Sequence, residues 1–300
     1  WSSAIDATAS YNTTCGACIV NIPDAAFKSA LINNPLVNTN ANTEIECSEA
    51  TAYTGFLMLA AQNINDLTGI EAFVNLTGLN CSANFLTSID LSNNSALTDL
   101  RCVNNQLTSL NTSYFPGLTK LYCWNNFITE LDLIDNPNID TLDCSNNLLT
   151  SLDMHANASL KFLFCPFNQI DTLDLSQNQL LDNLGCDHNL LQSLNIQNGN
   201  NANFIFFGAT INHSLTCIQV DDACVAIGIG HRDQVGLHAG VRVRSDVDIV
   251  LYIVAQLEAF AIAAFHGLAG RAIAPANTQR IAVRRNATGF GPGNDGRLNG

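Results

Sequence analysis

Apolar residues recur along residues 76–217 with a fixed period of 21, and the polar positions between them recur with the same period. Each turn follows the pattern LxxLxCxxNxLxxLxLxxNxx. The LxC and LxL segments alternate apolar and polar positions, as a strand with one buried face requires. A unit of this length cannot bury its own apolar side, whereas stacked units share a continuous core. The pattern therefore predicts a solenoid of short parallel strands over residues 76–222.

Six consecutive turns keep the pattern, and a seventh keeps part of it. The six start at Leu76, Leu97, Leu118, Ile139, Leu160 and Leu181. The seventh keeps the register at Ile205, Phe207, Leu215 and Cys217, with Thr210 in place of the asparagine. We therefore expect about seven coils, with residues 64–72 as a lead-in to the first.

Every complete turn also carries one cysteine and one asparagine at matching positions. The cysteines are Cys81, Cys102, Cys123, Cys144, Cys165 and Cys186. The asparagines are Asn84, Asn105, Asn126, Asn147, Asn168 and Asn189. The asparagines are expected to point inward and to bond backbone groups of their own and the adjacent coil. The cysteines are expected to be small buried hydrophobic residues. A disulfide stack or a metal-binding row is disfavoured, because neighbouring side chains run parallel and no CxxC motif or histidine accompanies them.

Taken together, these slots resemble the leucine-rich-repeat family, in particular the short cysteine- and asparagine-containing repeats of bacterial secreted or cell-surface proteins. The resemblance covers roughly residues 19–222. It implies a right-handed coil of parallel strands with a small helical cap at the N-terminal end. It also implies a non-enzymatic protein- or glycan-binding, adhesive module that is extracellular or on the bacterial surface. A structural spacer in a tandem-repeat surface protein is the alternative. Residues 1–18 look like the end of a junction between repeat blocks, so we expect further blocks in the parent chain.

Residues 19–75 are predicted to form the helical cap that covers the first coil. Pro23 and Asp24 are helix-start signals, and a helix is expected over residues 24–33. A second helical segment is expected over residues 49–61. The loop between them has the spacing of a calcium-binding helix–loop–helix, with ligand positions at Asn38, Asn40, Asn42, Glu46 and Glu49.

The chemistry of this loop is weakened relative to that pattern. Asn38 stands where an aspartate is expected, and Thr43 stands where a glycine is expected. Only Glu46 and Glu49 bring charge, and calcium favours several carboxylates, so poor affinity is predicted. We expect no resident cofactor, with a low-affinity calcium site as the alternative to a purely structural loop.

Three cysteines lie outside the repeats at the N-terminal end. Cys15 and Cys18 form a CxxC pair, and Cys47 lies inside the predicted cap. No βαβ context or basic partner accompanies the pair, which disfavours a redox role. A structural disulfide among the three is expected, with the pairing left open.

The composition of the chain changes near residues 218–225. Residues 1–217 hold 19 acidic and four basic residues, whereas residues 218–300 hold seven acidic residues and eight arginines. The net charge of −14 argues against a nucleic-acid partner and disfavours an anionic membrane surface. Residues 223–300 do not continue the repeat. They are expected to be a separate domain, a membrane-proximal segment or a non-native reading frame. The apolar run 247–268 is the one candidate for membrane contact, although Gln256 and Glu258 interrupt it.

Outward positions beside the cysteines are the candidate ligand-binding surface. They include an aromatic group with charged neighbours, namely Arg101, Tyr122, Trp124, Asp143, Phe164 and Asp187. Exposed aromatic residues beside polar groups are typical of protein or carbohydrate recognition, with ordinary surface variation as the alternative. Residues 1–217 contain no GxSxG, HExxH or glycine-rich phosphate loop, so we expect no enzyme and no catalytic residues in the repeats.

Overall fold

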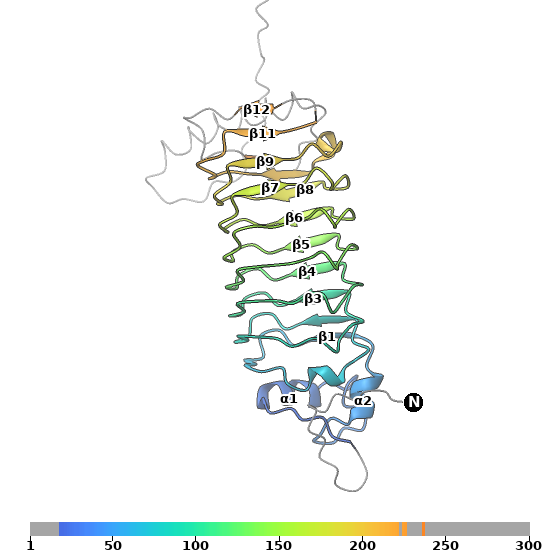
Figure 1. The fold of residues 1–300 in the computed structure, drawn as a ribbon. Helices are drawn as coiled ribbons and strands as arrows, with labels where there is room; N and C mark the ends of the chain where they lie inside the picture. The colour runs from blue at the N-terminus through green and yellow to red at the C-terminus, as the bar shows by residue number, and fades with distance from the viewer. Residues whose placement is uncertain (1–17, 222–223, 227–235, 238–300) are drawn as a thin grey trace, which may run out of the picture.

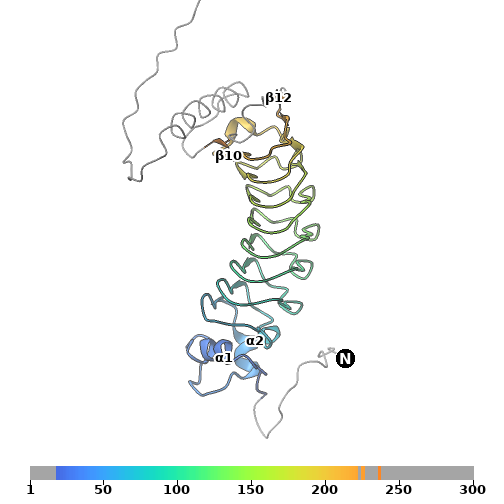
Figure 2. The same cartoon turned by 90° about the vertical axis from the view of Figure 1, so that its left-hand side faces the viewer.

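The computed structural model describes residues 18–221, 224–226 and 236–237. In these ranges the protein is a gently curved rod of stacked coils, with two short helices at its N-terminal end (Figures 1 and 2). The predictions for residues 1–17, for Cys15 and for the run 247–268 lie outside the described residues. Among the described residues, no helix is long and apolar enough to cross a membrane.

The elements are short, and most strands have three residues. The helices are α1 (Ala25–Ile32) and α2 (Cys47–Ala52), with 3-10 turns η1 (Ile70–Ala72) and η2 (Asn201–Asn203). The strands are β1 (Phe56–Met58), β2 (Gly78–Asn80), β3 (Asp99–Arg101), β4 (Lys120–Tyr122), β5 (Thr141–Asp143), β6 (Phe162–Phe164), β7 (Thr172–Asp174), β8 (Asn183–Gly185), β9 (Ser193–Asn195), β10 (Phe206–Gly208), β11 (Cys217–Gln219), β12 (Cys224–Ala226) and β13 (Gly236–Leu237).

One strand from each coil joins a long sheet along the rod. Its order is β1-β2-β3-β4-β5-β6-β8-β10-β13, and all neighbours are parallel except the last pair. The central residues of consecutive strands face each other, as Leu100, Leu121 and Leu142 do. All three are fully buried. This confirms the predicted solenoid of parallel strands. A second, smaller sheet forms only in the last coils, in the order β12-β11-β9-β7.

The inward asparagines hold neighbouring coils together, as predicted. Asn126 is representative: its amide nitrogen donates to the carbonyls of Cys102 and Cys123, and its oxygen accepts from the Leu107 amide. Each such side chain therefore hydrogen-bonds to backbone groups of two adjacent coils. These groups lie in buried turns, where no neighbouring strand can pair with them. A buried amide group left unpaired costs about 1–3 kcal/mol, so the ladder contributes to both stability and register.

The cap confirms the first predicted helix and corrects the second. Asp24 caps α1 by accepting from the Phe27 amide at 2.9 Å, and Asn33 is its C-cap. The second helix begins at Cys47 and ends at Ala52, well short of residue 61. The chain then enters β1, which pairs in register with β2. Strand pairing therefore replaces the expected helix, and the sheet begins one coil before the predicted boundary at residue 76.

The seventh turn is more regular than its sequence suggests. Phe207 pairs with Leu184, so it takes the leucine slot, and Ala209 takes the cysteine slot. Asn212 takes the asparagine slot: it donates to the carbonyls of Cys186 and Ala209 and accepts from the Leu191 amide. The predicted asparagine position at Thr210 is therefore wrong by two residues. Asn189 and Asn212 are 23 residues apart instead of 21, because the turn that contains η2 is longer.

Candidate functional site

The candidate binding residues lie along one face of the long sheet, which we call the strand face. Arg101, Tyr122, Asp143 and Phe164 occupy successive register positions on β3, β4, β5 and β6. Their side chains are partly exposed, and each lies between a buried leucine and a buried cysteine. The structure therefore brings these four together in one column. Trp124 and Asp187 lie two residues further along their turns, on the other side of the cysteines.

Arg101 is the centre of the first cluster on this face. Its guanidinium lies 5.2 Å from the ring centroids of both Phe56 and Tyr122. It also donates two hydrogen bonds to Asp99, at 2.8 and 2.9 Å. The Asp99 carboxylate raises the pKa of Arg101 further. The result is a planar cation held in a fixed orientation, which costs little additional entropy when a ligand binds.

Three phenylalanines form the second cluster. Phe164 is stacked against Phe162 with a centroid distance of 4.5 Å and against Phe206 at 5.2 Å. Phe206 belongs to β10, two strands away from β6, with β8 between them. The ring of Phe164 crosses β8 above Gly185, where a β-carbon would lie only 2.9 Å from Cδ1 of Phe164. The missing side chain at Gly185 thus allows an aromatic patch that spans three strands.

The two acidic candidates of the strand face are already engaged within the protein. Asp143 accepts from the amide and hydroxyl of Ser145, and burial raises the pKa of its carboxyl despite these bonds. Asp187 accepts from the amide and hydroxyl of Thr210 at 2.7 and 2.6 Å. These aspartates therefore order the loops beside the patch. Trp124, in contrast, is 37% exposed and remains accessible to a ligand.

Sequence reasoning missed Phe56, Phe162 and Phe206, which complete the two clusters. Phe56 lay in the segment assigned to the cap, and Phe206 lay in a turn whose register was misplaced. The sequence does contain a sign of these clusters, because glycine occupies outward strand positions at Gly78 and Gly185. At both positions a ring from the neighbouring strand occupies the space that a β-carbon would take.

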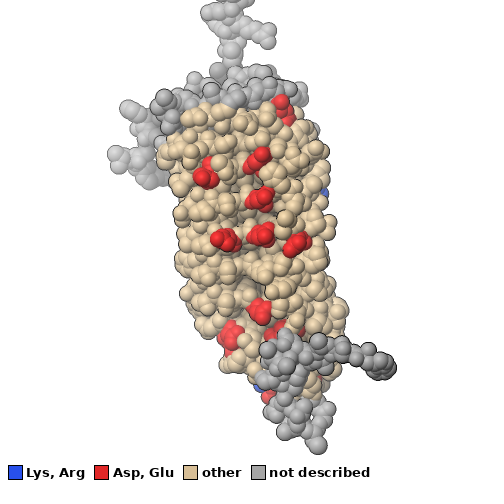
Figure 3. Space-filling model, in the orientation of Figure 1, with Lys and Arg blue, Asp and Glu red and all other residues tan. Residues whose placement is uncertain are grey.

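Charge is distributed unevenly around the rod. The basic residues of the coils lie in or next to the long sheet, at Arg101, Lys120 and Lys161. Acidic side chains are spread along the length of the solenoid (Figure 3). Exposed aspartates recur in the second half of the turns, at Asp90, Asp132, Asp153 and Asp174.

The residues of the calcium-like loop come together, but they bond to one another. Glu46 accepts from the side-chain amides of Asn40 and Asn42 at 2.9 and 2.6 Å. The oxygens of these two amides accept from backbone amides within the loop, so nitrogens rather than oxygens face Glu46. Glu49 accepts from Thr39, from the Asn40 amide and from the Glu46 amide.

These internal bonds bear directly on whether the loop suits a cation. Amide hydrogens occupy the positions beside Glu46 where a calcium ion would need oxygen ligands. Asn38 keeps one buried oxygen without a partner, but its amide group donates to Ile32 and Asn42 carbonyls. Within the described residues, no three His, Cys, Asp or Glu side chains gather as a metal site. The side chains of the loop are thus bonded to one another, and the metal-ligand role stays a sequence-based prediction.

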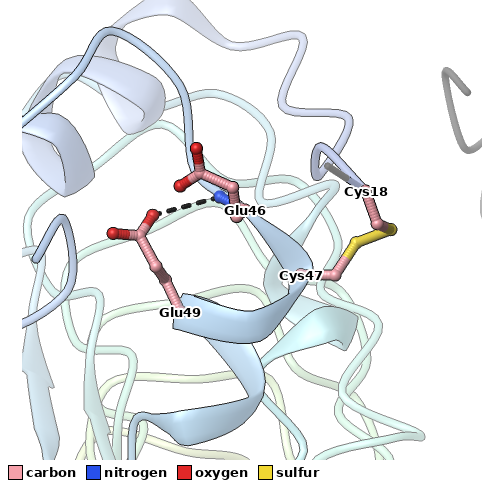
Figure 4. The surroundings of a disulfide bond; sticks show 4 residues. All are labelled: Cys18, Glu46, Cys47 and Glu49. Atoms are coloured by element: carbon pink, nitrogen blue, oxygen red, sulfur yellow. Dashed lines mark hydrogen bonds between the residues drawn. A yellow bond between two sulfur atoms is a disulfide. The ribbon is translucent and has the colours of Figure 1, made fainter. Parts of the chain in front are cut away.

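The predicted structural disulfide is present, and it joins two of the three candidate cysteines. Cys18 and Cys47 are bonded, and the bond joins the chain before α1 to the start of α2 (Figure 4). The carboxylate of Glu49 also accepts from the Glu46 amide at this helix start. The six ladder cysteines are free and fully buried. Burial raises the pKa of Cys81 to about 12 and raises the pKa of the other five thiols as well. They therefore act as small apolar side chains.

Comparisons with known proteins agree with this architecture. Residues 39–178, just under half of the chain, match the family described as the endo-beta-N-acetylglucosaminidase EndoS LRR domain. Internalin C2 from Listeria monocytogenes aligns with 21% identity and a TM-score of 0.51, over 67% of this chain and 87% of that one. The functional domain of InlJ from Listeria monocytogenes, which includes a cysteine ladder, aligns with 25% identity and a TM-score of 0.37.

The alignment with InlJ covers 69% of this chain but only 63% of that domain, so the chain spans less than two thirds of it. No curated protein sequence matches the chain. The coil geometry carries the assignment: a buried leucine column, a cysteine ladder and an asparagine ladder repeat along parallel strands in register. The described residues therefore have a leucine-rich-repeat fold with ladders of cysteine and asparagine, and residues 39–178 match a leucine-rich-repeat family model.

Proposed function

We propose that the chain is a non-enzymatic recognition module that binds a protein partner on the strand face. The observation that supports this most strongly is the pair of preorganised clusters on one rigid sheet. One is Arg101 with Phe56 and Tyr122, and the other is Phe162, Phe164 and Phe206. Aromatic and arginine side chains held in place by packing are the typical anchors of protein interfaces.

The orientation of the rings favours a protein over a glycan. Sugars usually stack on an open aromatic face. Phe164 is stacked against two neighbours, and the guanidinium of Arg101 covers one face of Tyr122. These rings offer mainly their edges, which suit the irregular contacts of apolar side chains. Trp124 retains more open surface, and a glycan ligand would have to depend on it.

A location outside the cytoplasm, in the medium or on a bacterial surface, is part of the proposal. The bond between Cys18 and Cys47 supports it, because structural disulfides persist mainly in oxidising compartments.

The test compares strand-face variants on arrays of extracellular proteins and of glycans. Phe164→Ala and Tyr122→Ala should each weaken binding to a captured protein at least tenfold, the loss typical of a hot-spot residue. Phe127→Ala is the matched control, since this residue is 52% exposed but lies outside the strand face. Binding only to glycans would favour the sugar-binding alternative. Binding to neither array, or equal loss in all three variants, would contradict a strand-face site.

A further inference from the structure

An open pocket of about 630 Å³ lies at the N-terminal end of the rod, between the cap and the first strand. Its walls come from α2, from the segment that leads to β1, and from the loop before α2. The apolar lining includes Leu36, Ala52 and Phe56, and the polar lining includes Ser48, Glu49 and Thr54. A volume of this size accommodates a long side chain or a small organic molecule. None of these residues except Phe56 belongs to the strand-face clusters.

Glu49 gives this pocket an unpaired negative charge. The residue is only 9% exposed. Its carboxylate accepts hydrogen bonds from the amide and hydroxyl of Thr39 and from the amides of Asn40 and Glu46. Its bonding partners are uncharged donors of the loop and backbone. Among the described residues, Glu49 forms no ion pair, and the one lysine of the cap, Lys28, is bonded to Glu44 at 2.6 Å.

The remaining lining determines which cation fits. Leu36 is 73% exposed at the pocket, and Ala52 and Phe56 extend the apolar wall. Such a wall suits a chain of methylene groups, while Ser48 and Thr54 supply hydroxyl oxygens that accept hydrogen bonds. Oε2 of Glu49 accepts a single hydrogen bond, from the Glu46 amide, and can accept another. Arg101 lies near Phe56, but its charge is balanced by Asp99.

We propose that this pocket binds the side chain of a lysine presented by a protein partner. The methylene stem would pack on Leu36, Ala52 and Phe56, and the ammonium group would reach the carboxylate of Glu49. The charge complementarity is consistent with the net charge of −14 and with the acidic side chains along the visible face of the rod (Figure 3). This assignment rests on the proposed function only in that the lysine belongs to a partner protein. The pocket shares Phe56 with the Arg101 cluster, and its other lining residues lie outside the strand-face clusters.

The probe for this site is N-acetyl-L-lysinamide, titrated into the full chain labelled with ¹⁵N. We expect saturable shifts of the amide signals of residues 48–56, with a dissociation constant in the millimolar range. N-acetyl-L-norleucinamide keeps the stem but lacks the ammonium group. It should bind at least tenfold more weakly, because a charge-assisted contact in a pocket is worth about 1.4 kcal/mol or more.

Two variants locate the binding. Ala52→Lys places a tethered ammonium group in the pocket at an exposed helix end, and should abolish the shifts without lowering the melting temperature. Thr108→Lys introduces the same charge at an exposed position on a distant coil and should leave binding unchanged. Equal binding of both probes, no shifts with either, or unaltered binding by Ala52→Lys would overturn the assignment. The assay contains no partner protein, so its result is independent of the strand-face test.

Discussion

The hydroxyl of Thr112 lies 2.7 Å from the side-chain oxygen of Asn136 in the next coil and donates to it. A second asparagine ladder runs along the core through Asn94, Asn136, Asn157 and Asn178. Phe115 takes the place of asparagine in this ladder, and it is fully buried. Thr112 stands three residues before it, in a slot that Leu133 fills in the following coil. We infer that the small threonine leaves room in the core for the large phenylalanine.

We predict that Thr112 and Phe115 are energetically coupled. Thr112→Leu alone should crowd Phe115, and Phe115→Asn alone should leave a cavity, so each should lower the free energy of unfolding. The double variant recreates the pattern of the other coils and should be more stable than the sum of the single changes predicts. A coupling energy of about 1–3 kcal/mol is expected from denaturant unfolding. Additive single effects would contradict the compensation.

The ladder cysteines should not react with alkylating reagents while the protein is folded. Their thiols are fully buried, and burial raises the pKa of Cys102, Cys123 and Cys144 well above the usual value. Only the thiolate reacts with alkylating reagents, so iodoacetamide should leave these residues unmodified at pH 8. After unfolding in guanidinium chloride they should be modified completely. Peptide mass spectrometry distinguishes the two states, and rapid labelling of the native ladder would contradict the buried assignment.

Much of this fold follows directly from the repeat. The leucine, cysteine and asparagine slots of the six complete turns are correct because each buried position repeats the same local constraint. The asparagine position predicted for the seventh turn is wrong because a two-residue insertion shifts the register. Ala209 also replaces the cysteine that identifies the strand position in the other turns. The clusters on the strand face depend on contacts between strands. The stacking of Phe164 with Phe206 requires both the missing side chain at Gly185 and the corrected register.

Acid should weaken the cap through Glu49. Burial opposes ionisation of this carboxyl, but contacts with Glu46 and Thr39 lower its pKa from the ordinary value of 4.5 to about 2. Its contribution is therefore fully present above pH 4.5 and is lost as the pH falls toward 2. Glu49→Gln should lower stability at pH 7 by about 1–2 kcal/mol. The gap between variant and native protein should close toward pH 2 in thermal unfolding, and a gap independent of pH would contradict this role.

Calcium should not stabilise the native loop, because amide nitrogens of Asn40 and Asn42 already bond to Glu46. We expect no rise in melting temperature with millimolar CaCl₂. Replacing both residues by aspartate removes these donors and adds carboxylates, so the Asn40→Asp, Asn42→Asp variant should be destabilised without the ion and recover with it. MgCl₂ at equal concentration controls for ionic strength. A calcium-dependent rise in the native protein would show instead that the loop rearranges to coordinate the ion.

Gly185→Ala should disturb the strand face more than the core. The new β-carbon would lie 2.9 Å from Cδ1 and 3.0 Å from Cε1 of Phe164, so the ring must move away from Phe206. Overpacking of this kind costs about 1–3 kcal/mol, and the displaced ring should also weaken partner binding. Denaturant unfolding and the protein array measure the two effects separately.

Gly117→Ala is the matched control for this change. A β-carbon there meets no atom closer than Cγ2 of Thr98 at 3.8 Å, so stability and binding should both be nearly unchanged. If Gly185→Ala lowers stability but binds the partner as tightly as the native protein, Phe164 does not contribute to recognition. The binding site would then lie nearer Arg101 and Tyr122. The strand partner of Gly185 is Phe164, so this substitution does not reach the Arg101 cluster directly.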